Sequence, residues 1–141
     1  MNEYIVNKQI SIKATPEIVW EALTDPVKTK KYFFNCKVIS DWQPGSPIIF
    51  KGRIFLFIKI EMHGKIIKAE PGKILQYTLQ NNRGSDGRST VTDTLHYENG
   101  VTTLTITDDV GKDEDAQDRY TRSVKGWDKI LKGLKKMLEK K

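Results

Sequence analysis

Apolar and polar residues alternate along most of the chain before residue 110, as they do in half-buried β-strands. In residues 4–13, for example, Val6, Ile10 and Ile12 alternate with polar side chains. The strands predicted in this way are 4–13, 36–42, 47–53, about 55–69, 75–80, 89–97 and 101–108. The long fourth segment is expected to bend or bulge near Gly64, and Asn99-Gly100 favours a hairpin between the last two strands.

Helices are predicted at three places. Thr15-Pro16-Glu17 and Asp25-Pro26 are typical helix starts, because a side-chain oxygen can accept a free backbone N–H and proline fits the first turn. They predict two short helices in succession, the second ending at about Lys31. Over about 113–139, apolar residues recur every three or four positions, which predicts one long amphipathic helix. At about 1.5 Å per residue this helix is roughly 40 Å long.

Threonines distinguish the two sides of the last two predicted strands. Val91 and Leu95 share a side with Asp93. In the last strand, Leu104 and Ile106 point to one side and the threonines between them point to the other. One face of the sheet should therefore meet water, whereas the other must be covered. The C-terminal helix is long enough to cover it. With no repeat or linker, residues 1–141 are expected to form a single α+β domain, a curved antiparallel seven-stranded sheet with two short helices after the first strand.

The sequence also resembles a known family. Residues 15–26, Thr-Pro-Glu-Ile-Val-Trp-Glu-Ala-Leu-Thr-Asp-Pro, are similar to the first-helix motif of the SRPBCC (START-like) superfamily, in its branch similar to the activator of heat-shock-protein-90 ATPase. Later segments resemble that branch in the same order. They are Trp42 with Pro44-Gly45, Gly64-Lys65-Ile66, Pro71, Leu75-Gln76-Tyr77, residues 89–92, Gly100 through Leu104-Thr105, and Gly126-Trp127 with Leu131 and Leu134.

The resemblance implies a helix-grip fold, in which a curved antiparallel sheet wraps around a long C-terminal helix and a cavity lies between them. Relatives in the superfamily include lipid and hormone binders, aromatic cyclases and stress proteins, so the fold alone does not identify an activity. The resemblance covers only the domain similar to the C-terminal part of the chaperone activator.

Composition narrows the class of protein further. The 141 residues include 24 Lys and Arg against 18 Asp and Glu, a net charge of +6, and one cysteine. Such a length supports one ordinary core, and Cys36 can form no internal disulfide. No apolar run approaches the length of a membrane span, and the N-terminus lacks a signal-peptide pattern. We therefore expect a cytoplasmic protein. We also expect it to be a monomer or weak homodimer.

A cavity under the helix would be lined by the covered sheet face and the inward side of the helix. Large rings are abundant there, and they can either wall a pocket or fill the core. The predicted lining residues are Tyr32, Phe33, Trp42, Phe50, Phe55, Phe57, Tyr77, Val91, Asp93, Leu95, Tyr120, Val124 and Trp127.

Asp93 is the most informative of these residues, because an inward carboxylate is costly unless it is paired or hydrogen-bonded. The alternative is a register break or edge position that returns Asp93 to solvent. The hydroxyls of Tyr77 and Tyr120 are further candidate polar anchors. Gly126, inside the long helix, indicates close approach, either by a packed segment or by a ligand beside Trp127.

Signatures of metal binding and catalysis are weak. His63, His96 and Cys36 lack the spacing of a zinc site, and no nucleophile or phosphate-loop motif occurs. We therefore expect no cofactor. Lysines in residues 125–141 can be a solvated helix face or a stripe for phosphates or a membrane surface, but no nucleic-acid motif accompanies them.

Three functions follow as hypotheses. The first is a non-enzymatic, stress-related protein that binds a small apolar or amphipathic molecule in the cavity. The second is an interaction with a heat-shock-protein-90-type chaperone through surface contacts, which the resemblance implies. The third is a cyclase- or hydrolase-like enzyme acting on an aromatic or polyketide-like substrate, with Asp93 and tyrosine hydroxyls as acid-base groups. A completely filled interior would favour the surface roles.

Overall fold

The order of strands and helices agrees with the sequence prediction. The structure is a computed structural model that describes residues 4–54, 58–81 and 88–140. Its elements are β1 (Ile5–Ile12), α1 (Pro16–Thr24), α2 (Pro26–Tyr32), β2 (Cys36–Ser40), β3 (Pro47–Ile54), β4 (Ile58–Glu70), β5 (Ile74–Asn81), β6 (Ser89–Glu98), β7 (Val101–Asp109) and α3 (Ala116–Glu139).

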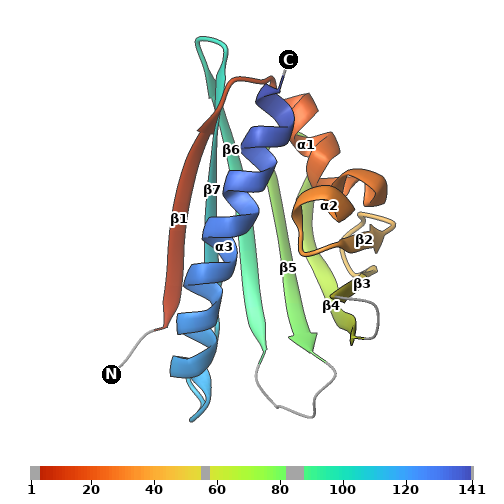
Figure 1. Ribbon diagram of the computed structural model, residues 1–141, viewed down its shortest axis with the longest axis vertical. Helices are drawn as coiled ribbons and strands as arrows, with labels where there is room; N and C mark the ends of the chain where they lie inside the picture. Colours follow the sequence, from red (N-terminus) through yellow and green to blue (C-terminus); the bar gives the residue numbers. More distant parts are fainter. Residues whose placement is uncertain (1–3, 55–57, 82–87, 141) are drawn as a thin grey trace.

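The strands form one seven-stranded sheet in the order β1-β7-β6-β5-β4-β3-β2, and every neighbouring pair is antiparallel. Figure 1 shows α3 lying lengthwise across one face of this sheet, with α1 and α2 beside it near β2. The predicted helix-grip fold is thus confirmed. The hairpin between β6 and β7 turns at Asn99 and Gly100, both with positive φ, as the Asn-Gly pair predicts.

The short helices begin where the capping residues predict. The Thr15 hydroxyl accepts a hydrogen bond from the Ile18 N–H at 3.4 Å, and the Asp25 carboxylate accepts one from the Val27 N–H at 2.9 Å. The long helix begins at Ala116, three residues after the predicted start. Asp113 is held outside the helix by Arg119, whose guanidinium also donates to the Val110 carbonyl.

Strand β4 is irregular close to the predicted bend. Its register against β5 shifts between Ile66 and Lys68. At Gly64, a Cβ atom would lie only 1.7 Å from the Thr78 carbonyl oxygen. Glycine therefore permits close approach of the β5 backbone at this position.

One strand boundary was predicted wrongly. The strand expected over 36–42 ends at Ser40, and Trp42 adopts a left-handed conformation with φ of 57°. The Ser40 hydroxyl accepts the Trp42 N–H at 3.0 Å, which turns the chain out of the sheet. Apolar character at Trp42 therefore reflects packing against the core and not strand continuation.

Two glycines of α3 face α2 and the loop that follows it, and only Gly133 is tightly approached. A Cβ at Gly126 would lie 3.6 Å from the Phe34 ring, an ordinary contact. At Gly133 it would lie 3.1 Å from the Tyr32 Cβ, which is tighter. The close approach expected at Gly126 is thus a packing contact, and the closer one is at Gly133.

Candidate functional site

The interior cavity lies between the sheet and α3, and its volume is about 20 Å³. This is room for about one water molecule. Its lining residues are Leu23, Thr29, Tyr32, Phe33, Val38, Trp42, Ile48, Phe50, Leu75, Tyr77, Asp93, Leu104, Ile106, Trp127, Ile130, Leu131 and Leu134. The space that the sequence analysis assigned to a pocket is therefore almost filled by side chains.

The predicted lining residues fall into three groups. Those that line the interior cavity are Tyr32, Phe33, Trp42, Phe50, Tyr77, Asp93 and Trp127. Val91 is fully buried in the core, and Leu95, Tyr120 and Val124 pack against the core from partly buried positions. Phe55 and Phe57 lie outside the described residues.

Aliphatic side chains that were not predicted also line the interior cavity. Leu104 and Ile106 of β7 line the interior cavity, and α3 contributes Ile130, Leu131 and Leu134. The threonine alternation had already assigned Leu104 and Ile106 to the covered face. Their aliphatic side chains line the same cavity as the aromatic rings.

Aromatic rings fill the centre by packing against one another. The Phe33 and Phe50 ring centroids are 5.3 Å apart, and those of Phe50 and Tyr77 are 5.7 Å apart. Phe33 also meets Trp127 edge-on, with centroids 5.8 Å apart and planes at 90°. These geometries are favourable for aromatic pairs. The rings thus form a continuous layer from β3 to α3.

Asp93 is buried at the wall of the interior cavity, with 3% of its surface exposed. It lies opposite Ile106 in the β6–β7 register, on the face covered by α3. Within the described part of the chain, its Oδ1 atom has no hydrogen-bond partner. Burial first, and the charge of Asp108 second, raise the pKa of Asp93 to about 8. Asp93 is therefore mainly protonated at neutral pH.

Asp108 is the second buried carboxylate of this face. Its Oδ2 atom accepts hydrogen bonds from the Trp127 indole N–H at 2.8 Å and from the Ser123 hydroxyl. Its Oδ1 atom has no partner among the described residues. Asp108 therefore links α3 to β7, whereas the Oδ1 atom of Asp93 forms no such link among the described residues.

Two tyrosine hydroxyls were candidate anchors, and they differ in position. Tyr77 lines the interior cavity, and burial followed by the charge of Asp93 raises its pKa well above the usual value. Tyr120 instead packs beside Tyr4, with ring centroids 5.9 Å apart. Tyr32, which also lines the interior cavity, donates its hydroxyl to the Ala22 carbonyl at 2.7 Å. Of the two candidate hydroxyls, Tyr77 is therefore the one that lines the interior cavity together with Asp93.

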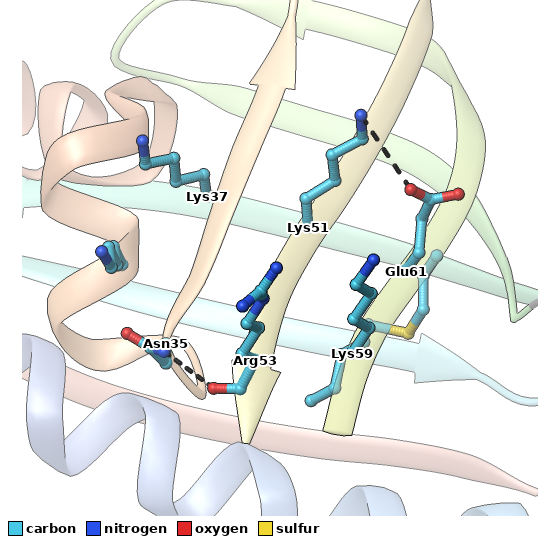
Figure 2. A pocket seen from close by; sticks show the side chains of 10 residues that line it. Asn35, Lys37, Lys51, Arg53, Lys59 and Glu61 are labelled. Carbon is cyan, nitrogen blue, oxygen red and sulfur yellow. Dashed lines mark hydrogen bonds and ion pairs between the residues drawn. The ribbon is translucent and has the colours of Figure 1, made fainter. Parts of the chain in front are cut away.

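A second hollow lies on the outside of the protein and has a volume of about 800 Å³. We name it the basic groove. It is lined by Lys30, Asn35, Lys37, Lys51, Gly52, Arg53, Lys59, Ile60, Glu61 and Met62. Figure 2 shows basic side chains from β2, β3 and β4 gathered around it. The Asn35 amide donates to the Arg53 carbonyl at 2.7 Å and holds the end of β3 against the loop before β2.

Metal and nucleophile candidates are dispersed. His63 pairs with Glu61 at 2.9 Å, and His96 lies 3.7 Å from Glu98. Cys36 is buried, which raises the pKa of its thiol. Over the described ranges, no three His, Cys, Asp or Glu side chains are grouped to hold a metal ion. No helix within those ranges is long and apolar enough to cross a membrane.

Solved structures of similar proteins share this architecture. The solution structure of ChR145 from Cytophaga hutchinsonii has 32% sequence identity, with 99% of this chain and 97% of that chain covered and a TM-score of 0.76. CV1439 from Chromobacterium violaceum has 24% identity over 98% and 99% of the two chains, with a TM-score of 0.81. The Aha1 dimer from Colwellia psychrerythraea has 23% identity over 96% of each chain, with a TM-score of 0.74.

Family comparison covers nearly the whole fold. No curated protein sequence gives a significant match. Residues 13–139 match the family described as "Activator of Hsp90 ATPase homolog 1-like protein". This range extends from the residue after β1 to the last residue of α3. The chain therefore belongs to the activator of Hsp90 ATPase homolog 1-like family, within the SRPBCC superfamily.

Proposed function

We propose that this protein binds a small, mainly apolar molecule in the interior between the sheet and α3, with one polar group of the ligand beside Asp93. The observation that carries the proposal is the unpartnered Oδ1 atom of Asp93 at the wall of the interior cavity. A buried polar atom without a partner costs free energy, and a ligand that supplies a hydrogen bond recovers part of it. The family's fold supports ligand binding in general terms.

The chemistry of the interior limits the ligand. Because the raised pKa keeps Asp93 mainly protonated at neutral pH, its carboxyl group can donate as well as accept a hydrogen bond. A ligand carbonyl or hydroxyl complements such a group. A buried ligand carboxylate would meet Asp108 on the same face and pay for burying a further charge. A neutral apolar compound with one carbonyl or hydroxyl group therefore fits best.

The cavity must enlarge to receive such a ligand. Pockets for small molecules usually have about 300–1,000 Å³, against about 20 Å³ here. Trp127, Ile130 and Leu131 close the cavity from the side of α3, so an outward shift of this helix would open it. The cost of opening lowers the apparent affinity, because only the open fraction of the protein binds.

A screen with matched variants tests the interior site. Thermal unfolding is measured with neutral apolar carbonyl and hydroxyl compounds, with fatty acids and sterols as further classes. We expect at least one neutral compound to raise the melting temperature of the wild type and of Asp41→Asn, an exposed control. Asp93→Leu should abolish the shift, and Asp93→Asn should retain part of it. Absence of a shift across the panel, or an equal shift in Asp93→Leu, would contradict the proposal.

A second candidate is contact with an Hsp90-type chaperone through the protein surface. The family match favours it, and so does the small volume of the interior cavity, since surface contacts need no opening. The test is the ATPase rate of the host's chaperone with and without this protein. A concentration-dependent increase supports the candidate, and an unchanged rate together with no capture in a pull-down removes it.

A further inference from the structure

Like charges face each other directly across the strands of the basic groove. Lys37 lies opposite Lys51 in the β2–β3 register, and Arg53 lies opposite Lys59 in the β3–β4 register. Side chains in such positions are neighbours, and like-charged neighbours lower the stability of a sheet. All four side chains are exposed, and Figure 2 shows them around one hollow.

Little negative charge compensates these cations. Among the described residues that line the groove, Glu61 is the acidic one. Its Oε1 atom lies 4.0 Å from Lys51 Nζ, and its Oε2 atom lies 2.9 Å from His63 Nε2. Among the described residues, Lys37, Arg53 and Lys59 form no ion pair within 4.0 Å. Lys30, from the last turn of α2, adds a fifth basic side chain. The basic groove therefore concentrates positive potential that an anionic partner would relieve.

We propose that the basic groove is a docking surface for an extended acidic segment of another protein. The inference goes beyond the interior site and depends neither on that site nor on a chaperone. The cations lie on neighbouring strands and at alternate positions along a strand, so they are spread over a surface. Such a distribution matches carboxylates that are repeated along a peptide. Ile60 and Met62 also line the groove from partly buried positions, but they pack against the core.

Other anions fit less well. A compact phosphate would need converging donors, whereas the five cations are distributed over three strands and the last turn of α2. A flat membrane surface cannot enter a concave groove.

The test is fluorescence anisotropy with a labelled short peptide of Glu interspersed with Ser, at low and at moderate salt. The groove variant is Lys51→Gln/Arg53→Gln/Lys59→Gln. The matched control, Lys125→Gln/Lys129→Gln/Lys132→Gln, removes the same charge from exposed positions of α3. We expect the wild type to bind the peptide, the groove variant to bind about tenfold more weakly, and the control to bind nearly as the wild type does.

Further arms separate the other anions. A single-stranded oligonucleotide, anionic vesicles and inorganic pyrophosphate are measured with the same proteins. The proposal is overturned by no peptide binding, by equal loss in both variants, or by groove-dependent binding of one of these probes in place of the peptide. The groove variant loses two like-charge pairs, Lys37–Lys51 and Arg53–Lys59, and only one ion pair, which Lys51 forms with Glu61 at 4.0 Å near the surface. Its melting temperature should therefore not fall below that of the wild type. A lower value would contradict the proposed repulsion.

Discussion

The indole N–H of Trp127 donates a hydrogen bond to Asp108 Oδ2 over 2.8 Å, inside the apolar layer between α3 and the sheet. This bond joins the middle of α3 to the end of β7. The other buried carboxylate of the same face, Asp93, lacks such a partner at Oδ1 among the described residues. The two acids thus have different roles: Asp108 positions the helix, and Asp93 is the group to which we assign ligand contact.

Trp127→Phe should destabilise the protein by about 1–3 kcal/mol, because it leaves the buried Asp108 with one hydrogen bond fewer while keeping an aromatic ring. Urea unfolding measures the change. Trp20→Phe serves as the control, since Trp20 packs against the core and no hydrogen bond from its indole is found within the described chain. Equal losses in the two variants would mean that the bond to Asp108 contributes little.

The raised pKa of Asp93 predicts a pH dependence of stability. An aspartate has a pKa of about 3.9 when unfolded, against about 8 in the folded protein. Between these values the folded protein holds a proton that the unfolded chain has lost. The free energy of unfolding should therefore fall with rising pH, by up to about 1.4 kcal/mol per pH unit, and this contribution should level off above the folded pKa.

Asp93→Asn removes this titration. We expect the variant to gain stability relative to the wild type as the pH rises from 5 towards 8, with the difference measured by urea unfolding at several pH values. Parallel curves for the two proteins would show that Asp93 titrates normally and is not buried as described.

Two glycines of α3 should respond differently to alanine. Gly126→Ala should stabilise the protein by up to about 1 kcal/mol, because alanine favours helix and the new Cβ meets Phe34 at 3.6 Å, an ordinary contact. Gly133→Ala should gain less or lose stability, because its Cβ would be 3.1 Å from the Tyr32 Cβ. Thermal unfolding of both variants checks the order, and a larger gain at Gly133 would be inconsistent with this packing.

Much of the fold followed from local sequence. The caps at Thr15 and Asp25, the Asn99-Gly100 hairpin and the long amphipathic helix are set by short-range chemistry, so they were predicted closely. The inward position of Asp93 was predicted because alternation places it on the same side of the strand as Val91. Trp42 was misassigned because a hydrogen bond to the Ser40 hydroxyl turned the chain at a residue that looked like part of a strand.

The interior cavity and the basic groove could not be predicted from the alternation of apolar and polar residues. The volume of the interior cavity is set by how the Phe33, Phe50 and Tyr77 rings meet, which is a matter of three-dimensional packing. The basic groove combines Lys51 and Lys59, which the register of β3 and β4 brings together, with Lys30, which the packing of α2 adds. In the sequence alone, the lysines of the C-terminal helix are the more conspicuous cluster.

The interior binding site is tested most directly by a crystal structure of the protein with the neutral compound that gives the largest thermal shift. We expect the compound between the sheet and a displaced α3, with its carbonyl or hydroxyl group within hydrogen-bonding distance of Asp93. A compound bound outside the core, with Phe33, Phe50 and Trp127 still packed as they are here, would contradict the interior site.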